Sequence, residues 1–273
     1  MAPHYFDIHT HLHFGAFKDD SREAVGRALD ESIWMIQVGT QKDTSTQAVE
    51  LAEKYTEGVY ATVGLHPIHT GKSFHDKNEV EEKENGPASD GEVFEYEYYK
   101  KLALRPKVVG IGECGLDYFR LSEETKKKQY DAFEQQIALA QEVGKPLMLH
   151  IRNAYDDALA ILKKNPGAKG NVHFFAGSWD VAKQFLDIGF TLSFTGVVTF
   201  TRDYDEVIKN APLDMIMSET DSPYVAPVPH RGQRNESLYV PEVVKRIAEI
   251  RGEDLEKVKI ALVQNVRRIF AIS

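Results

Sequence analysis

Two histidines near the amino terminus have a spacing that suits metal binding. They lie in the segment Asp7-Ile8-His9-Thr10-His11. Successive side chains of a β-strand point to opposite faces, so His9 and His11 are expected to share one face. Two imidazoles on one face can chelate a metal ion, although an exposed or hydrogen-bonded pair is the competing interpretation. The pair alone is therefore a weak indication of a metal site.

Four further residues of metal-ligand type end or follow predicted strands. They are Glu113, His150, His173 and Asp221, at or near the ends of runs 108–113, 146–150, 171–174 and 215–218. A parallel barrel brings the carboxyl ends of its strands to one face, where the chemistry of such folds takes place. Any one of these residues could be structural. Their joint arrival at the face that carries His9 and His11 predicts a metal centre.

The elements that must position these residues alternate between short β-rich runs and longer helical patterns. The strand candidates are 5–11, 33–38, 59–65, 108–113, 146–150, 171–174, 191–194 and 215–218. The helical patterns are 22–32, 44–55, 94–104, 123–143, 155–164, 179–188, 205–210, 241–251 and 254–270. Eight β-then-α units predict an α/β protein with a closed (β/α)8 TIM-type barrel, forming one domain over residues 1–273. A doubly wound open sheet is the structural alternative.

An acidic insertion at about 71–92 interrupts the third unit. Residues 76–97 contain nine acidic residues and two lysines, so this segment carries −7 of the formal net charge of −9. A solvated surface loop is expected here, and a lid or a partner contact is the alternative. The overall charge argues against a basic surface for nucleic acid, but the nearly neutral remainder is compatible with a local phosphate-binding cleft.

Composition and targeting signals favour a cytoplasmic enzyme. Hydrophobic residues make up 42% and charged residues 27% of the chain, as in ordinary globular proteins. No apolar run approaches the roughly 18 residues of a membrane span, and no secretory signal opens the sequence. The single cysteine, Cys114, cannot form an internal disulfide and is expected to be buried. No membrane association is expected, and the oligomeric state is open, a monomer included.

Other catalytic arrangements lack their motifs. A nucleophilic Cys114 would need a partner base, and Ser-His-Asp catalysis lacks a G-x-S-x-G elbow. Glycine-rich phosphate loops of the Walker or dinucleotide type are also missing from the sequence.

The sequence resembles the TatD family of metal-dependent hydrolases, within the wider amidohydrolase-like barrels. The resemblance runs from Asp7–His11 to 265–270, through the segments 64–67, 112–118, 149–152, 219–224 and 231–236. The chain departs from the family pattern at Phe174 and Ala176, where Cys and Ser are more frequent, and at Ser237, where Pro is usual. These departures leave every presumed ligand in place.

The resemblance implies a centre of two divalent metal ions, either Mg²⁺ or Zn²⁺, with Mn²⁺ as a further candidate. The first ion would be held by His9, His11, Glu113 and Asp221, and the second by Glu113, His150 and His173. Glu113 would bridge the ions, because one carboxylate can offer an oxygen to each. Two such ions can clamp the attacking and leaving oxygens of a phosphoryl displacement. Asp221 would orient or deprotonate the attacking water, so Asp221 and Glu113 are the predicted catalytic residues.

Four residues are predicted to bind the substrate. They are His66, Arg152, Arg231 and Arg234. Pro67 favours an extended His66 at the end of the third strand, and guanidinium groups match phosphate oxygens. A turn residue and surface salt bridges are the respective alternatives. His69, His75 and His230 are expected to be too peripheral to act as ligands.

The function that follows from the resemblance is a metal-dependent deoxyribonuclease, acting as a 3′–5′ exonuclease with DNA as substrate. The same ions could instead polarise a carbonyl, which leaves an ester or amide hydrolase such as an aminoacyl-tRNA deacylase as one alternative. A non-catalytic metal-binding protein is the other.

Overall fold

The computed structural model describes residues 3–71, 73–74, 78–79, 88–89, 91–119 and 123–273. Within them, one sheet of eight parallel strands follows the order β1-β2-β3-β6-β7-β8-β9-β10. The strands are β1 (Tyr5–Thr10), β2 (Ile33–Val38), β3 (Val59–Val63), β6 (Val108–Asp117), β7 (Leu147–Arg152), β8 (Gly170–Val172), β9 (Thr191–Phe194) and β10 (Ile216–Ser218). All eight predicted strands are confirmed, and so is the barrel.

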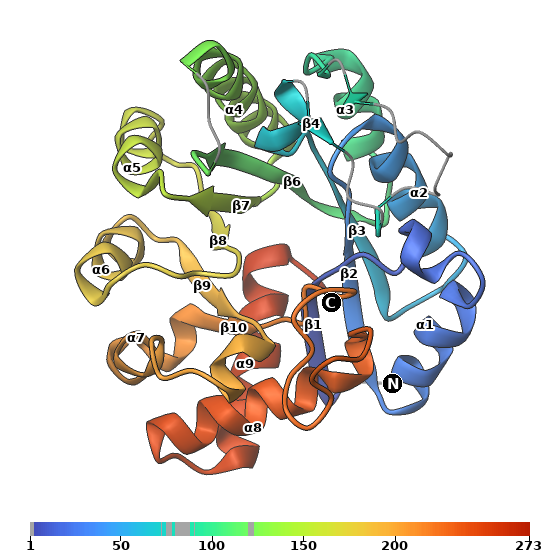
Figure 1. Cartoon of the computed structure of the whole chain (residues 1–273), viewed down its shortest axis with the longest axis vertical. Helices are drawn as coiled ribbons and strands as arrows, with labels where there is room; N and C mark the ends of the chain where they lie inside the picture. Colours follow the sequence, from blue (N-terminus) through green and yellow to red (C-terminus); the bar gives the residue numbers. More distant parts are fainter. Residues whose placement is uncertain (1–2, 72, 75–77, 80–87, 90, 120–122) are drawn as a thin grey trace.

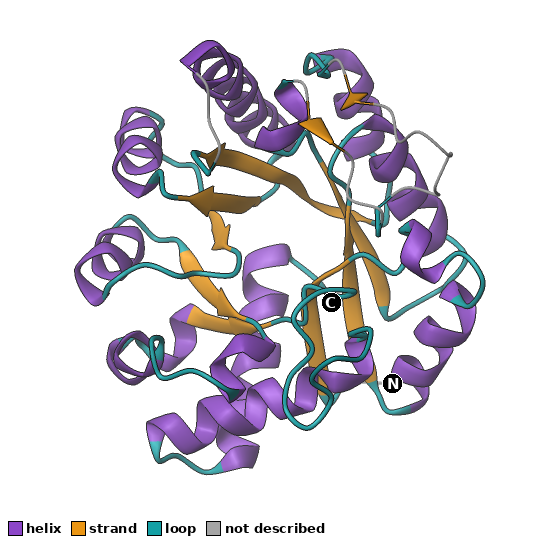
Figure 2. Ribbon diagram, viewed as in Figure 1, coloured by secondary structure: helices purple, strands orange, loops and turns teal. Residues whose placement is uncertain are grey.

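Helices surround the ring of strands (Figures 1 and 2). The α-helices are α1 (Ser21–Asp30), α2 (Lys42–Ala52), α3 (Tyr96–Ala103), α4 (Glu123–Val143), α5 (Tyr155–Lys164), α6 (Trp179–Asp187), α7 (Asp205–Asn210), α8 (Val240–Arg251) and α9 (Leu255–Phe270). Short 3-10 helices are η1 (Gly15–Phe17), η2 (Pro67–Thr70), η3 (Gly196–Thr199), η4 (Leu213–Met215) and η5 (Ser237–Tyr239). The helices bury apolar stripes against the outer face of the strands, which forms the larger core.

A second apolar cluster fills the barrel and is closed by α9. It joins Ile8 of β1, Met148 of β7 and Met217 of β10 with Val266 and Phe270 of α9. Because these strands lie on different sides of the ring, the cluster occupies the barrel interior. The opposite end, where the strands finish, remains for polar side chains.

The two edges of the sheet, β1 and β10, meet just beyond the carboxyl end of β10. The backbone N–H of Asp221 donates to the carbonyl of His9, and the N–H of His11 donates to that of Ser222, both at 2.8 Å. Asp7 accepts hydrogen bonds from the backbone N–H and the hydroxyl of Thr220, at 2.8 and 2.6 Å. These contacts bring the first and last strands together, which excludes the open-sheet alternative.

The acidic insertion at 71–92 lies partly outside the described residues, and His75 with it. Its described parts include the antiparallel pair β4 (Ser73–Phe74) and β5 (Ala88–Ser89). The organisation of residues 1–273 as one domain stays a prediction. In the described part of the chain, no helix is long and apolar enough to cross a membrane.

Candidate metal centre

His9 and His11 point to the same place, but not through simple strand alternation. Asp7 pairs with Met35 and Thr10 with Gln37, so β1 has one residue more than β2 between these pairs. Such a bulge re-aims side chains near active sites. The two imidazoles meet at 3.2 Å between their Nε2 atoms, and both side chains are buried.

Glu113 lies in the middle of β6, because this strand continues four residues past its predicted end. Gly112 and Gly115 flank the glutamate with φ values of 136° and 137°. A Cβ at either glycine would lie 2.1–2.2 Å from a carbonyl oxygen of β7, that of Met148 or that of His150. Only glycine allows this close approach, which places Glu113 between the neighbouring strands.

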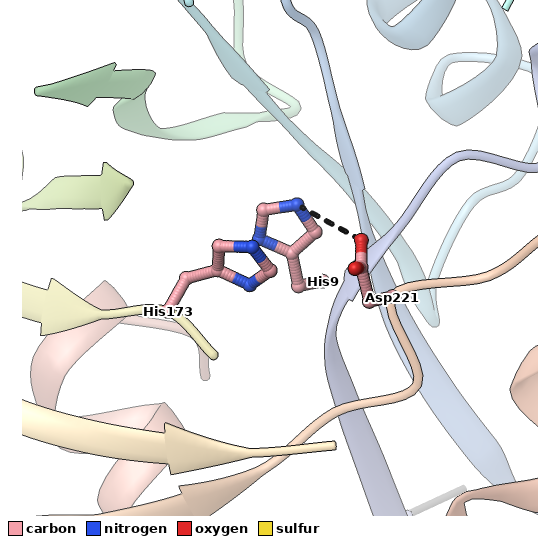
Figure 3. Close-up of side chains that lie close together, drawn as sticks. All are labelled: His9, His173 and Asp221. Carbon is pink, nitrogen blue, oxygen red and sulfur yellow. Dashed lines mark ion pairs between the residues drawn. The ribbon is translucent and has the colours of Figure 1, made fainter. Parts of the chain in front are cut away.

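The two carboxylate oxygens of Glu113 face different groups of ligand atoms. Oε2 lies 3.3 Å from Nε2 of His9 and 3.9 Å from Nε2 of His11. Oδ1 of Asp221 completes this first group at 3.9 Å from His9 and 3.6 Å from His11. Figure 3 shows the Asp221 carboxylate directed at His9, with the His173 ring lying flat against the other side of His9.

The other oxygen of Glu113 faces three imidazoles, which form a second group. Oε1 lies 3.0 Å from Nδ1 of His150, 3.2 Å from Nε2 of His66 and 3.6 Å from Nε2 of His173. His66 was predicted to bind substrate rather than metal, and the structure places it among the ligand candidates. Its distance to Glu113 is shorter than that of the predicted ligand His173.

The spacing of these donors fits a bound cation in each group. Metal–nitrogen and metal–oxygen bonds of about 2.0–2.2 Å put the ligand atoms of one ion roughly 3.0–3.6 Å apart. The donor separations in both groups, 3.0–3.9 Å, lie close to this range. Three overlapping sets of ligand atoms also come within 4.8 Å of one another, and Glu113 belongs to two of them.

The protonation states of Glu113 and His9 favour ligation. Burial opposes ionisation of Glu113, but the surrounding histidines, led by His66 and His9, outweigh it and hold the pKa of the carboxyl well below its usual range. Burial, reinforced by His173, lowers the pKa of His9 to about 3. An ionised carboxylate therefore faces a neutral imidazole, and both offer lone pairs to a cation.

Two carboxylates that were not assigned a role from the sequence orient the histidines. Oε1 of Glu219 lies 2.8 Å from Nδ1 of His173, and Oδ2 of Asp117 lies 2.9 Å from Nε2 of His150. In each ring, the other nitrogen is the one that faces Glu113. Carboxylate–histidine pairs of this kind fix the tautomer and the direction of a metal-binding imidazole. Burial opposes protonation of His173, but Glu219 outweighs it and raises the pKa to about 10, so a cation that binds this ring must displace a proton from it.

Asp221 adopts a backbone conformation that is uncommon for a residue with a side chain. Its φ is 55°, in the left-handed region that aspartate tolerates better than most residues. Its N–H is held by the carbonyl of His9. The left-handed backbone conformation and the hydrogen bond to His9 together fix the position of the Asp221 carboxylate.

His69 lies nearer to the ligand candidates than the sequence suggested, although it belongs to none of the three ligand sets. It is buried, its ring lies 5.9 Å from that of His66, and its Nε2 lies 3.1 Å from Oε1 of Glu79. Glu79 belongs to the acidic insertion and also accepts a hydrogen bond from the hydroxyl of Thr40. A described part of the insertion therefore packs beside the metal centre. His230, by contrast, stacks on Tyr239 at 3.7 Å.

The three predicted arginines have different partners. Arg234 forms a two-pronged ion pair with Asp20, at 2.7 and 2.6 Å, which is the structural alternative considered for it. Arg152 and Arg231 are exposed, and Nη1 of Arg231 donates to the carbonyl of Ala226. Cys114 is fully buried, as expected, and its sulfur lies near the carbonyl of Met148.

Comparison with known proteins agrees with this geometry. The model of the family described as TatD related DNase matches residues 6–271. An uncharacterized metal-dependent hydrolase of Bacillus subtilis, YabD, is 36% identical over 98% of this chain and 99% of its own. A Klebsiella pneumoniae protein named 3′-5′ ssDNA/RNA exonuclease TatD is 35% identical, with 98% of each chain covered. The crystal structure of YJJV, a TatD homologue from Escherichia coli, superposes with a TM-score of 0.84 at 27% identity over the full length of both chains.

Proposed function

Because this chain belongs to the TatD family of metal-dependent hydrolases, we propose that it cleaves phosphodiester bonds of single-stranded nucleic acid, removing nucleotides from the 3′ end of DNA. The observation that carries the proposal is the split environment of Glu113. One carboxylate oxygen faces His9 and His11, and the other faces a separate group of imidazoles. This arrangement supports a pair of divalent cations bridged by one carboxylate.

The first cation would be held by His9, His11, Glu113 and Asp221, and the second by Glu113, His150 and His173. Bound there, divalent cations supply Lewis acidity that offsets the charge of the reacting phosphate. Imidazole ligands favour zinc, and carboxylate oxygens suit magnesium or manganese, so the donor set admits all three.

The side chains of the chain supply positioning and proton transfer. Asp221 is the most exposed of the first group, with 13% of its side chain accessible, so its carboxylate can orient a water molecule and accept its proton. His66 is suited to contact a phosphate oxygen beside the second group. Burial, reinforced by His150, lowers the pKa of His66 to about 4. The ring is therefore neutral near pH 7, and it would contact the phosphate through a hydrogen bond and not through a positive charge.

The test is a nuclease assay on single-stranded DNA, double-stranded DNA and RNA, with Mg²⁺, Mn²⁺ or Zn²⁺ and with a chelator. We expect metal-dependent release of nucleotides from the 3′ end of single strands. Glu113→Ala should lose at least about 100-fold in activity, since it removes an electrostatic contact to both groups. Glu249→Ala, an exposed change on α8, is the matched control.

Two results would overturn parts of the proposal. Absence of cleavage with all three metals, combined with hydrolysis of an aminoacyl-tRNA ester, would select the rival ester hydrolase. Full nuclease activity in Glu113→Ala would remove Glu113 from the site. Metal analysis by mass spectrometry should find two ions per wild-type chain and fewer in the variant.

A further inference from the structure

Two exposed guanidinium groups lie directly over exposed phenylalanine rings in the segments beyond the carboxyl ends of the strands. The Cζ atom of Arg152 is 3.8 Å from the ring centroid of Phe119, and that of Arg231 is 3.9 Å from the centroid of Phe200. These phenylalanines are 46% and 44% exposed. Distances this short correspond to van der Waals contact between the guanidinium plane and the ring face.

The first stack borders the second group of ligands. Arg152 follows His150 by two residues on β7 and pairs in the sheet with Asp117 of β6. The backbone N–H of Phe119 donates to Oδ1 of Asp117 at 2.8 Å, while Oδ2 of the same carboxylate bonds His150. One aspartate therefore connects this stack to the metal centre.

The second stack is attached to the segment that follows Asp221. Arg231 is anchored to the carbonyl of Ala226, in the segment that follows Asp221. Phe200 is the C-cap residue that follows η3, and the first residue of this helix, Gly196, packs closely against the backbone of Val225. The first stack therefore belongs to β7 and the segment after β6, and the second to the segments after β9 and β10, elements that Figure 1 shows in separate parts of the ring.

Arg152 and Arg231 differ in their ion pairing from Arg234, the third arginine that the sequence predicted to bind substrate. Arg234 also lies over a ring, but that ring belongs to the buried Phe17 and the guanidinium is paired with Asp20. Among the described residues, neither Arg152 nor Arg231 forms an ion pair. Each keeps its charge and one planar face available for a ligand, with a phenyl ring supporting the other face.

We propose that the Arg152–Phe119 and Arg231–Phe200 stacks are nucleobase-binding subsites on either side of the reacting phosphate. An unpaired base stacks on the guanidinium, whose plane the phenylalanine holds in place. Stacking of this kind tolerates any base, because every base has a planar face. A paired base in a duplex has both faces covered by its neighbours, so these subsites select single strands. The inference rests on the proposed function and deepens it.

The experiment compares a single-stranded oligodeoxynucleotide with the same strand carrying abasic sites at its 3′-terminal positions. We expect Phe119→Ala and Phe200→Ala to raise KM for the intact strand by roughly 5- to 100-fold, with a smaller effect on kcat. The abasic strand should show the raised KM with the wild-type enzyme, and the substitutions should add little to it. Leu104→Ala, an exposed change at the end of α3, serves as the control and should leave KM unaltered.

A second pair of variants separates stacking from phosphate binding. Arg152→Lys and Arg231→Lys keep the charge and lose the planar face, so they should raise KM as the alanine variants do. Phe119→Tyr keeps an aromatic ring, so its KM should stay near the wild-type value. A wild-type KM in the lysine variants would contradict the subsites, and so would an equal rise in KM for intact and abasic strands in the alanine variants. Either result would leave the proposed nuclease activity unaffected. Absence of cleavage of either strand by the wild-type enzyme would instead refute the proposed function.

Discussion

At the scale of residues, the centre depends on which nitrogen of each histidine is free to bind. His150 presents Nδ1 to Glu113 and His173 presents Nε2, because Asp117 and Glu219 hold the opposite nitrogens. A ring flip of either histidine would break its carboxylate contact. The two carboxylates therefore set the direction of the imidazoles before any metal arrives.

Glu219→Gln should lower metal affinity by about 10- to 100-fold without removing a ligand atom. Glu219 is fully buried and also accepts from the N–H of Phe174 and the hydroxyl of Ser193, so glutamine loses one acceptor oxygen and the charge that orients His173. Isothermal titration of the metal-free protein measures the effect, with Glu249→Gln as an exposed control. Unchanged affinity would show that His173 needs no such partner.

The sequence pointed to most of the residues that the structure groups as ligand candidates, but it did not point to His66 as one of them or to the carboxylates that orient the histidines. His9, His11, His150 and Asp221 lie at or near the ends of the predicted strands, which hydrophobic periodicity reveals. Glu219 contacts a histidine 46 residues away, a pairing that depends on register between β8, β9 and β10. Register is set by tertiary packing, and no local pattern records it.

At the scale of elements, the strand that carries Glu113 shows where local propensity fails. Gly112 and Gly115 weaken the strand pattern, so the predicted end falls at Glu113, whereas β6 continues to Asp117. The glycines are retained in the strand because the β7 backbone approaches too closely for a Cβ. The same extension brings the Asp117 carboxylate within 2.9 Å of the His150 ring. Asp117 lies beyond the predicted end of the strand, so the sequence did not assign it to the site.

Glu79 attaches the acidic insertion to η2, and this contact should depend on pH. Burial opposes ionisation of Glu79, but hydrogen bonds from His69 and Thr40 outweigh it and lower its pKa from 4.5 to about 2. A depressed pKa means that the ionised form stabilises the fold above pH 4.5. This contribution to the free energy of unfolding is lost as the pH falls from 4.5 towards 2.

Glu79→Gln should therefore be less stable than the wild type at pH 6, by about 1–3 kcal/mol. The difference should shrink as the pH approaches 2, because the wild-type carboxyl becomes protonated as well. Urea denaturation across this pH range measures both proteins, and Glu256→Gln on exposed α9 surface is the control. A difference that stays constant with pH would mean that the Glu79 charge contributes nothing.

At the scale of the whole molecule, ligand candidates from β1, β6, β7 and the segments after β3, β8 and β10 converge on one small volume. Bound cations would therefore connect strands around most of the ring. A ligand that binds only the folded state stabilises it by about 2.7 kcal/mol when its concentration is 100 times Kd.

Removal of metal with a chelator should lower Tm by roughly 5–10 °C, given about 2–4 °C per kcal/mol for chains of this size. Scanning calorimetry before chelation, after it, and after addition of Mg²⁺, Mn²⁺ or Zn²⁺ measures the shift and ranks the metals. Glu113→Ala provides the reference, since its Tm should respond little to chelator. An equal shift in both proteins would place the stabilising metal elsewhere.

The contact between β1 and β10 has a consequence for biosynthesis. Thr10 and Ser222, which join these strands, are 212 residues apart, and His9 and Asp221 sit directly beside them. A ribosome that adds about 5–20 residues per second takes roughly 10–40 s to extend the chain from His9 to Asp221. During that interval the nascent chain carries an incomplete set of the candidate metal ligands, so the site can bind a cation only after β10 and Asp221 have emerged.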